Sequence, residues 1–569
     1  RLIAAKMRVM GVKLSKVPKL NPEDLTERET LLWQLIRELR EKVGELTDEI
    51  ARLKGEKEKP KIKPSRLEAK EKDSPPEADE ASETSGEKNS DSQEKKKRAG
   101  SAKRKKTLEL PIHEIKVIEP LQEIPTGSEF KGYQDYTVQE LLIKPHNIRY
   151  RLARWKTPTG EYLKGKLPEA VGKMGHFGPI LKSYLLYQYH HCHVTQPLLL
   201  TMMEDWGIDI SSGQLNRILV EDKEKYHTEK QDILQVGLSV STYINTDDTG
   251  ARHQGVNSYC THIGNEWFAW FETTPRKNRI NFLELLQGEK TNYVLTNEAL
   301  TYMAKQKLPK KLRHPLSLSI NRVFKDKDEW SDYLTQLGFI KPHHIKTATE
   351  GALLGALIRS GLNADLGIMS DGAGQFRLLE HALCWVHAER LINRLIPLTE
   401  AQRQAVETVQ DQLWDFYQEL KTDKTFTEQQ QQQHKARLQK RFDQIFTQTT
   451  LFETLNQVLK RLYRRKTELL KVLDRPDLPL HNNASEQDIR EFVTKRKISG
   501  STRSEAGRRC RDTFASLKKT CRKLGVSFWE YLKDRVSGNN AIPTLGTLIA
   551  NKAIESQCPL AENISLCLA

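Results

Sequence analysis

The sequence has few cysteines and no long apolar run. Its 569 residues include seven cysteines, none of them before Cys192, and none forms a C-x-x-C pair. An odd and scattered set argues against a disulfide framework and against a cysteine-built zinc finger, and it fits a reducing cytoplasm. The nearest approach to a membrane span, Gly351 to Ile358, is far shorter than the roughly 20 residues required, so no membrane association is expected.

Basic residues outnumber acidic ones. The chain has 91 Lys and Arg against 75 Asp and Glu, a net charge of +16. Such an excess favours an anionic partner, with nucleic acid the first candidate, although a solvated basic surface gives the same count. A chain of this length is expected to hold about two to four domains.

Residues 20–54 carry a heptad pattern. Leucines recur every seventh residue from Leu25 to Leu53, and Ile36, Val43 and Ile50 form a second apolar series. Leucine at one core position and β-branched residues at the other are typical of a parallel two-stranded coiled coil. We expect the chain to form a homo-oligomer through residues 25–53. The alternative is an amphipathic helix packed on its own chain.

The next two segments differ in composition. Residues 55–106 are rich in Lys, Glu, Ser, Asp and Pro and are expected to form a disordered linker. The linker ends in two basic runs, 95–98 and 103–106, which can contact phosphate or stay solvated. Residues 107–170 contain strand-like pieces at 108–118 and 133–143. They predict a small β-containing domain without zinc ligands.

Residues 171–236 have a helical pattern. After a helix at 177–187, a second begins at Pro197, and a third, 211–219, follows a glycine turn and two serines. Short helices joined by such a turn are typical of a helix-turn-helix. The last helix would present Gln214, Asn216 and Arg217 to a DNA groove. An αα-hairpin used only for packing is the alternative.

Residues 237–535 predict an α/β domain in which acidic residues follow strands. A strand at 238–245 leads into Asp247 and Asp248, a hairpin spans 258–272, and an apolar run at 368–370 delivers Asp371 before a glycine turn. Ligand and catalytic groups of open α/β sheets lie at such strand ends. Two carboxylates here and a third from a later helix can hold two divalent metals about 4 Å apart for in-line phosphoryl transfer. Mg²⁺, or Mn²⁺, is the expected cofactor because such ions prefer oxygen ligands.

This strand–hairpin–strand–helix order is the ribonuclease-H-like arrangement, and Glu486 is placed to supply the third acid. Only one of Asp247 and Asp248 can face the site, because side chains alternate along a strand. We favour Asp247. Taken singly, these acids are ordinary, since strand-end aspartates often only form turns and a helical glutamate is usually a surface residue.

Three further features lie near the expected acids. Cys384 and His387 are one helical turn apart and can share a metal, but two ligands do not close a site, so packing against the sheet is favoured. A helical insertion is expected at about 390–475, before Glu486, and residues 536–569 form a nondescript tail. Basic residues that follow Glu486 are expected to contact phosphate, unless they form a solvated face. They include Arg490, Lys495, Arg496, Lys497, Arg508 and Arg509.

Four motifs in order resemble the DDE transposases of the insertion-sequence-66 type, over roughly 175–535. They are Asp247-Asp248-Thr249-Gly250, Ser370-Asp371-Gly372, Cys384-Trp385-Val386-His387, and Asn482-Asn483-x-x-Glu486-x-x-Ile489-Arg490. The resemblance implies an α/β ribonuclease-H-like catalytic domain with Asp247, Asp371 and Glu486 as metal-binding catalytic acids. Asp248, Asn482 and Asn483 would support them. It further implies Mg²⁺-dependent cleavage of double-stranded DNA and strand transfer between element ends and target, in a bacterial, nucleoid-associated enzyme that works with accessory proteins.

The chain departs from this family in two motifs, and its segment 276–365 ahead of Asp371 is also long. The zinc-finger segment usual ahead of the helix-turn-helix has no counterpart here, because residues 107–170 contain no cysteine. The acid helix usually reads Asp-Asn-Asn followed by Glu-Arg, whereas this chain has His481 and Gln487 at the differing positions. A non-catalytic DNA-binding relic or regulator is therefore an alternative, and a nuclease that cuts without joining is a third reading.

Overall fold

The computed structural model describes residues 111–122, 124–167, 175–288, 291–422 and 428–557. The chain divides into two compact units, residues 1–71 and 72–569, and every described residue belongs to the second. The coiled coil predicted at 20–54 and the linker predicted at 55–106 therefore lie outside the described residues. No helix in the described ranges is long and apolar enough to cross a membrane.

Residues 111–167 form little regular structure. A short antiparallel hairpin joins β1 (Arg154–Lys156) to β2 (Tyr162–Lys164). The strands expected at 108–118 and 133–143 do not form within the described part of those ranges. Apolar side chains from Ile112 to Leu163 are exposed instead. A strand-like pattern without a second sheet or a helix to pack on is not enough to build a core.

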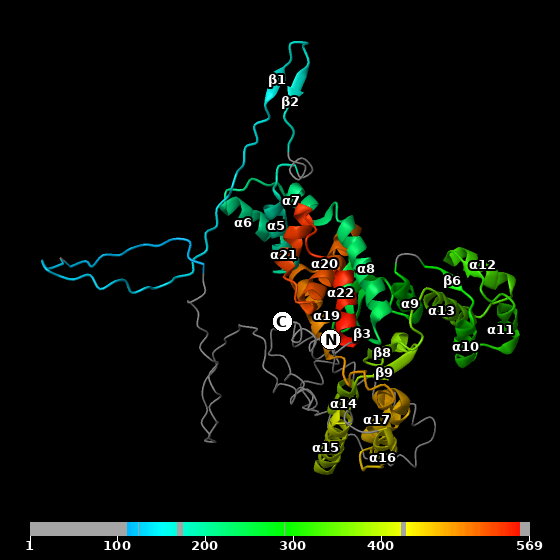
Figure 1. The fold of residues 1–569 in the computed structure, drawn as a ribbon. Helices are drawn as coiled ribbons and strands as arrows, with labels where there is room; N and C mark the ends of the chain where they lie inside the picture. Colours follow the sequence, from blue (N-terminus) through cyan, green and yellow to red (C-terminus); the bar gives the residue numbers. More distant parts are fainter. Residues whose placement is uncertain (1–110, 123, 168–174, 289–290, 423–427, 558–569) are drawn as a thin grey trace, which may run out of the picture. The chain divides into compact units, whose positions relative to one another are not determined.

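Four helices follow, shown with the whole fold in Figure 1. They are α5 (Pro179–His190), α6 (Gln196–Asp205), α7 (Ser212–Val220) and α8 (Glu224–Val240). The Ser211 side chain accepts the backbone N–H of Gln214 and caps α7, as the serines before it predict. Leu199, Leu215 and Leu219 anchor α6 and α7 in the core. Strand was expected from Leu238, but α8 continues to Val240 because Leu234 and Leu238 share its buried face.

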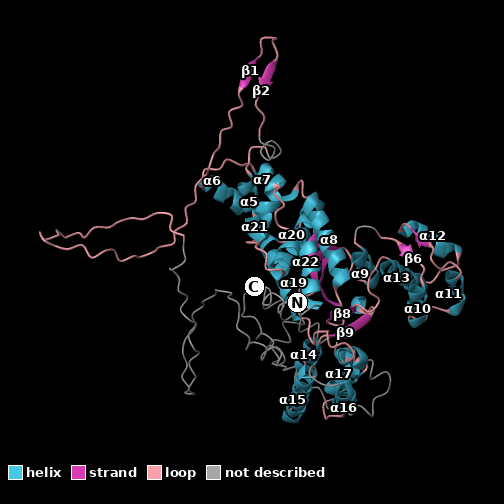
Figure 2. Cartoon of the chain, in the orientation of Figure 1, coloured by secondary structure: helices cyan, strands magenta, loops and turns pink. Residues whose placement is uncertain are grey.

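A mixed sheet of five strands, with strand order β5-β4-β3-β8-β9, forms the centre of the domain. Figure 2 draws strands in magenta and labels β8 and β9 of this sheet. Its strands are β3 (Tyr243–His253), β4 (Val256–Gly264), β5 (Ala269–Thr274), β8 (Gly367–Ser370) and β9 (Glu380–Leu383). The first three form an antiparallel meander, and β8 and β9 continue parallel to β3. β3 runs past Asp247 and Asp248 to His253, because β4 pairs with it along its whole second half.

The two faces of the sheet are covered differently. One face packs Phe271 against Phe492, with ring centroids 5.9 Å apart. Phe492 lies on α19 (Asn483–Ser499), and α20 (Glu505–Lys523) runs along β5, where its Ser516 accepts the backbone N–H of Phe271. The opposite face buries Ile263 and Trp270 together with residues of α8 and of the helices described next.

A first inserted segment separates β5 from β8. It comprises α9 (Arg279–Gln287), β6 (Tyr293–Val294), α10 (Asn297–Lys305), α11 (Lys310–Ser317), β7 (Val323–Phe324), α12 (Lys327–Gln336) and α13 (Pro342–Arg359). We call residues 279–359 the α9–α13 lobe. β6 and β7 pair with each other outside the main sheet. Buried aromatic rings, including Tyr293 stacked on Trp330 with centroids 5.8 Å apart, hold this lobe together.

A second, helical insertion separates β9 from α19. It contains α14 (Trp385–Asn393), α15 (Glu400–Thr422), α16 (Glu428–Thr447), α17 (Glu453–Tyr463) and α18 (Lys466–Leu469), and corresponds to the helical segment predicted at about 390–475. The buried Trp385 ring packs on Phe416 and Phe442. Its indole N–H donates to the Leu469 carbonyl, at 2.9 Å. α21 (Phe528–Ser537) then packs beside α5, and the predicted tail contains α22 (Leu545–Gln557).

Candidate active site

Asp247 and Asp248 lie on β3 and point to opposite faces of the sheet. Asp248 is paired in register with Thr261, whose hydroxyl donates to Asp248 Oδ1 at 2.6 Å. The Gln375 amide donates to Asp248 Oδ2 at 2.7 Å. Both oxygens of Asp248 are therefore engaged by protein donors. Asp247 is opposite His262 in the register and accepts the backbone N–H of Asp248 at 2.8 Å.

The electrostatic surroundings of the two aspartates differ. Burial raises the pKa of Asp247 to about 7, and the negative charges of Asp371 and Glu486 add to the rise. Burial also raises the pKa of Asp248, but hydrogen bonds from Thr261 and Gln375 oppose it. Asp247 is thus the member of the pair whose pKa responds to both of the other predicted acids. The structure brings these three carboxylates into one electrostatic neighbourhood.

Asp371 directly follows β8, as its apolar run and glycines predict. Its Oδ1 accepts the backbone N–H of Ala373 at 2.9 Å. Gly372 has φ of +94°, which favours glycine, and a Cβ there would lie 2.6 Å from the Leu383 side chain. The Arg279 guanidinium donates to the Gly374 carbonyl at 2.7 Å. Together with Gln375, which binds Asp248, these contacts hold the loop after β8 beside β3.

The first turn of α19 is attached to the sheet by three side chains. Asn482 is fully buried and its amide donates to the Thr246 carbonyl at 3.0 Å. Ser485 Oγ is hydrogen-bonded to His262 Nδ1 at 2.7 Å. His262 Nε2 lies 3.2 Å from Asp488 Oδ2. These contacts fix where Glu486 lies, and His262, Ser485 and Asp488 were not identified as site residues in the sequence.

Glu486 is paired with α14. Arg390 Nη1 lies 3.1 Å from Glu486 Oε1, and Nη2 lies 3.4 Å from Oε2. His387 Nε2 is 3.4 Å from the same Oε1. Arg390 was also missed, although it is three residues after His387 and so shares its face of the helix. The third predicted acid is therefore neutralised by a guanidinium in this structure.

Cys384 and His387 contact different groups in the structure. Cys384 precedes α14, its buried thiol accepts the backbone N–H of Asn482 at 3.3 Å, and burial raises the thiol pKa to about 12. The packing role favoured from the sequence agrees with this geometry. Among the described residues, no three His, Cys, Asp or Glu side chains are arranged to hold a metal ion. This includes the neighbourhood of Asp247, Asp371 and Glu486.

The residues predicted to read a DNA groove lie on α7. Gln214 is used locally, because its side-chain oxygen accepts from the backbone N–H and hydroxyl of Ser211. Asn216 is exposed and accepts the Gln196 amide of α6 at 3.2 Å. Arg217 is exposed. Asn216 and Arg217 are therefore the better placed of the three for contact with another molecule.

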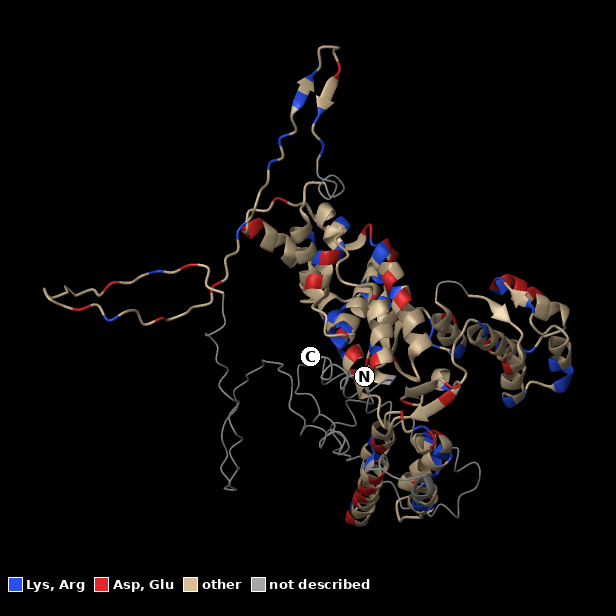
Figure 3. Cartoon of the chain, viewed as in Figure 1, with Lys and Arg blue, Asp and Glu red and all other residues tan. Residues whose placement is uncertain are grey.

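Three of the six basic residues predicted to contact phosphate are paired with other groups of the protein. Lys495 is buried, donates to the Tyr189 carbonyl at 2.7 Å and lies over its ring. Arg508 donates to Glu272 at 2.6 Å, and Arg509 pairs with Glu224 at 2.9 Å. Figure 3 shows acidic residues among the basic ones along these helices. Arg490 and Lys497 remain exposed, and Arg496 lies beside Gly250 of β3.

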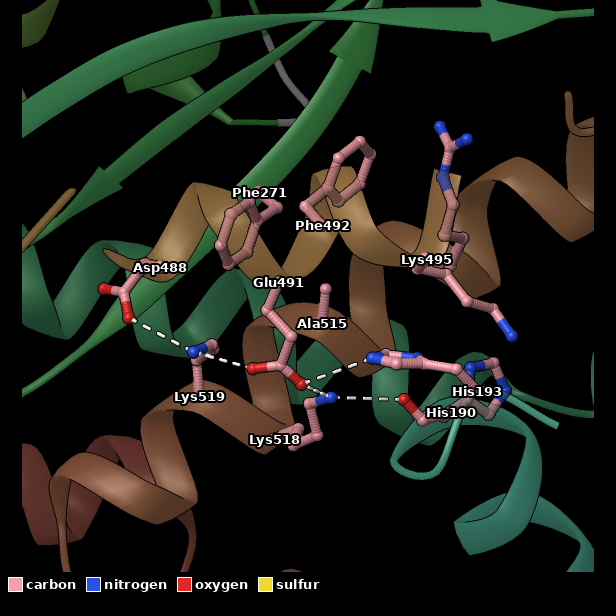
Figure 4. A pocket seen from close by; sticks show the side chains of 11 residues that line it. His190, His193, Phe271, Asp488, Glu491, Phe492, Lys495, Ala515, Lys518 and Lys519 are labelled. Atoms are coloured by element: carbon pink, nitrogen blue, oxygen red, sulfur yellow. Dashed lines mark hydrogen bonds and ion pairs between the residues drawn. The ribbon is translucent and has the colours of Figure 1, made fainter. Parts of the chain in front are cut away.

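A small cavity of about 30 Å³ lies between α19, α20 and the end of α5, and ion pairs surround it (Figure 4). Lys519 lies 2.7 Å from Glu491 and 3.7 Å from Asp488. Lys518 also pairs with Glu491 and donates to the His190 carbonyl. The charges that line this cavity hold α19 in place, and the cavity is about the size of one water molecule.

Comparisons with known proteins relate part of this chain to a transposase family. A family model described as "Transposase IS66 family" matches residues 366–509, which include Asp371, Cys384, His387 and Glu486. An uncharacterized protein, y4jO of Sinorhizobium fredii, is 45% identical over 324 residues, which cover 56% of this chain and 100% of that protein. No solved structure matches the chain.

Proposed function

Because the chain belongs to the IS66 transposase family, we propose that it cleaves DNA at the ends of an insertion sequence and joins those ends to target DNA. The catalytic domain would be ribonuclease-H-like. Support comes from the order of strand β3, hairpin β4–β5, strand β8 and helix α19. This is the order expected when Asp247, Asp371 and Glu486 share one site.

The observation that carries the proposal is the charge repulsion between these acids. Burial raises the pKa of Asp247 to about 7, with a further contribution from the charges of Asp371 and Glu486, and a divalent cation among the carboxylates would relieve the repulsion between them. Carboxylate oxygens are the ligands that Mg²⁺ and Mn²⁺ prefer, so the donor set fits. When bound, two such ions activate the attacking oxygen and stabilise the leaving oxygen of a phosphoryl transfer.

Glu486 can join this site only if its pair with Arg390 opens. A carboxylate held by both terminal nitrogens of a guanidinium is neutralised and is a poor ligand for a second cation. Opening would release Arg390 as well, beside a region where DNA phosphate is expected. We therefore assign Arg390 two roles, pairing with Glu486 at rest and contacting phosphate when DNA is bound.

DNA binding would use two further surfaces. Asn216 and Arg217 on α7 are proposed to contact the terminal inverted repeats, with α6–α7 acting as a helix-turn-helix. Arg490, Arg496 and Lys497 are proposed to contact phosphates beside the acids. Pairing of two element ends by a homo-oligomer formed through residues 25–53 completes the proposal, and accessory proteins would act with it.

A non-catalytic relic or regulator of the same fold is the second candidate. The observation that favours it is the Arg390–Glu486 pair, together with the absence of a three-ligand metal cluster among the described residues. Such a protein would bind element ends without cutting them.

A plasmid assay separates these functions. Full-length protein, Mg²⁺ and a supercoiled plasmid that carries both element ends should give nicks at the ends and products joined to new DNA, and chelation of the metal should abolish both. Binding without nicking would contradict the proposal and support the relic. Nicking without joined products would support a nuclease of the same fold.

A further inference from the structure

The α9–α13 lobe carries a run of basic residues without acids. Between Lys305 and Lys325 the sequence has seven Lys and Arg and no Asp or Glu. We define the α11 basic face as five residues from the end of α10 and from α11: Lys305, Lys307, Lys310, Lys311 and Arg313. Its four lysines are exposed and Arg313 is half-buried. Three acids of this lobe, Asp328, Glu329 and Asp332, lie instead on α12.

The local fold turns these side chains outward. Leu308 and Leu316 are buried in the lobe, so the opposite side of α11 faces solvent. Lys307, two residues after the end of α10, has a left-handed conformation with φ of +61°. Its N–H donates to the Ala304 carbonyl, and the N–H of Leu308 donates to the Met303 carbonyl. Glycine is the residue usually found at this position of a helix end, so the backbone gains nothing from lysine there.

No ion pair is seen for any of the five residues within the part of the chain that the structure describes. The contrast with α20 is direct. There Lys518, Lys519 and Lys523 pair with Glu491 or Asp488, in part inside the protein. Detaching those lysines for an outside phosphate would leave buried carboxylates unpaired. The α11 basic face has no such cost, and its like charges repel one another until an anion binds.

We propose that the α11 basic face binds the phosphate backbone of double-stranded DNA. The inference rests on the proposed function and adds a contact surface to α7 and α19. The lobe is joined to the candidate active site, since Arg279 contacts the Gly374 carbonyl and Phe282 packs edge-on against Phe376. DNA held on this face would therefore be held by the same lobe that supports the Asp371 loop.

The arrangement fits DNA better than a lipid surface. A helix that lies on a membrane inserts its apolar side between the lipids. The apolar side of α11, with Leu312 and Leu316, packs into the lobe instead. The exposed side is cationic and suits a polyanion whose phosphates are regularly spaced.

The test compares two triple variants of the full-length protein in buffer without divalent metal. Lys307→Gly/Lys310→Gln/Lys311→Gln removes three charges from the α11 basic face, and its glycine favours the observed backbone at position 307. The control, Lys325→Gln/Lys327→Gln/Lys346→Gln, removes three charges from the same lobe. There Lys325 and Lys346 lie within 4.0 Å of Asp326 and Glu350. Urea unfolding of each variant checks that it folds.

Binding of fluorescent duplex DNA would be followed by anisotropy over a range of salt concentrations. The α11 variant should bind at least about ten-fold more weakly near 0.1 M salt. The slope of log K against log salt should fall by about 2.7, because each phosphate that the protein no longer neutralises lowers it by about 0.9. The control should retain the wild-type slope.

Three results would overturn the inference. Equal losses of affinity in the two variants would show an effect of net charge alone. If the wild-type protein binds DNA and the salt slope of the α11 variant is unchanged, the α11 basic face does not contact DNA. The proposed function would not be affected by that result. Loss of binding to phosphatidylserine vesicles, with DNA binding intact, would assign the face to a membrane. Failure of the wild-type protein to bind any duplex would instead contradict the proposed function itself.

Discussion

Replacing Asp371 by asparagine is expected to reduce Mg²⁺-dependent DNA cleavage by at least about a thousand-fold, comparable to the loss of a major charge-stabilising group from an active site. Asparagine keeps the side-chain oxygen that accepts the Ala373 N–H, so the loop should keep its shape. Removing the negative charge weakens the binding of any metal held between Asp247 and Asp371. Binding to duplex DNA should stay within about two-fold, because no phosphate contact is removed. Nicking of labelled element ends measures the first quantity and anisotropy the second.

The matched control for this change is Asp365→Asn. Asp365 is exposed, lies six residues earlier, and is placed ahead of β8 and away from the strand end that carries Asp371. Cleavage by this variant should equal that of the wild type. Normal cleavage by the Asp371 variant would remove the residue from the catalytic site, whatever the control shows.

Asparagine substitutions at Asp247 and Asp248 are expected to reduce the cleavage rate by very different amounts. Asp247→Asn is expected to lose cleavage as fully as the Asp371 variant, because Asp247 is the residue whose pKa is raised by burial and then by the charges of both Asp371 and Glu486. Asp248→Asn should lose only about ten-fold or less. Its amide oxygen can still accept one of the hydrogen bonds now made by Thr261 and Gln375, and loss of a single hydrogen bond has a modest net effect.

Cleavage rates for the two variants, measured on the same DNA at saturating Mg²⁺, decide between them. Equal and large losses of rate would mean that both carboxylates act in the chemistry. A larger loss for Asp248→Asn would reverse the assignment and make Asp248 the metal ligand, with Asp247 in a supporting position.

The position of Asp371 directly after β8 could be predicted from local patterns, whereas Asp247 lies within β3 and not at its end. An apolar run that breaks into glycines identifies β8, and the side-chain alternation of a strand explains why Asp247 and Asp248 face apart. The β4–β5 hairpin is predicted by an equally local pattern. The end of α8 was not predicted correctly, since the apolar residues after Leu238 fit strand and helix alike and only packing distinguishes them.

The use of each charge could not be predicted, because it depends on partners far away in the sequence. Arg390 binds a glutamate 96 residues later, and Arg508 binds Glu272 of β5, 236 residues earlier. Lys495 looked like a phosphate contact, yet it donates to a carbonyl of α5. The exposed apolar residues at 111–167 show the same limit, because a strand pattern does not reveal whether a partner strand exists.

The most direct test of the proposed metal site is the binding of Mn²⁺ to the full-length protein. It would be followed by electron paramagnetic resonance in the presence of uncleaved element-end DNA. We expect bound Mn²⁺ in the wild type and in Asp365→Asn, and a loss of at least about ten-fold in affinity, or about 1.4 kcal/mol, in Asp371→Asn and in Glu486→Gln. Equal Mn²⁺ affinity in all four proteins would contradict it, because the three carboxylates would then not form the metal site on which the proposed cleavage and joining depend.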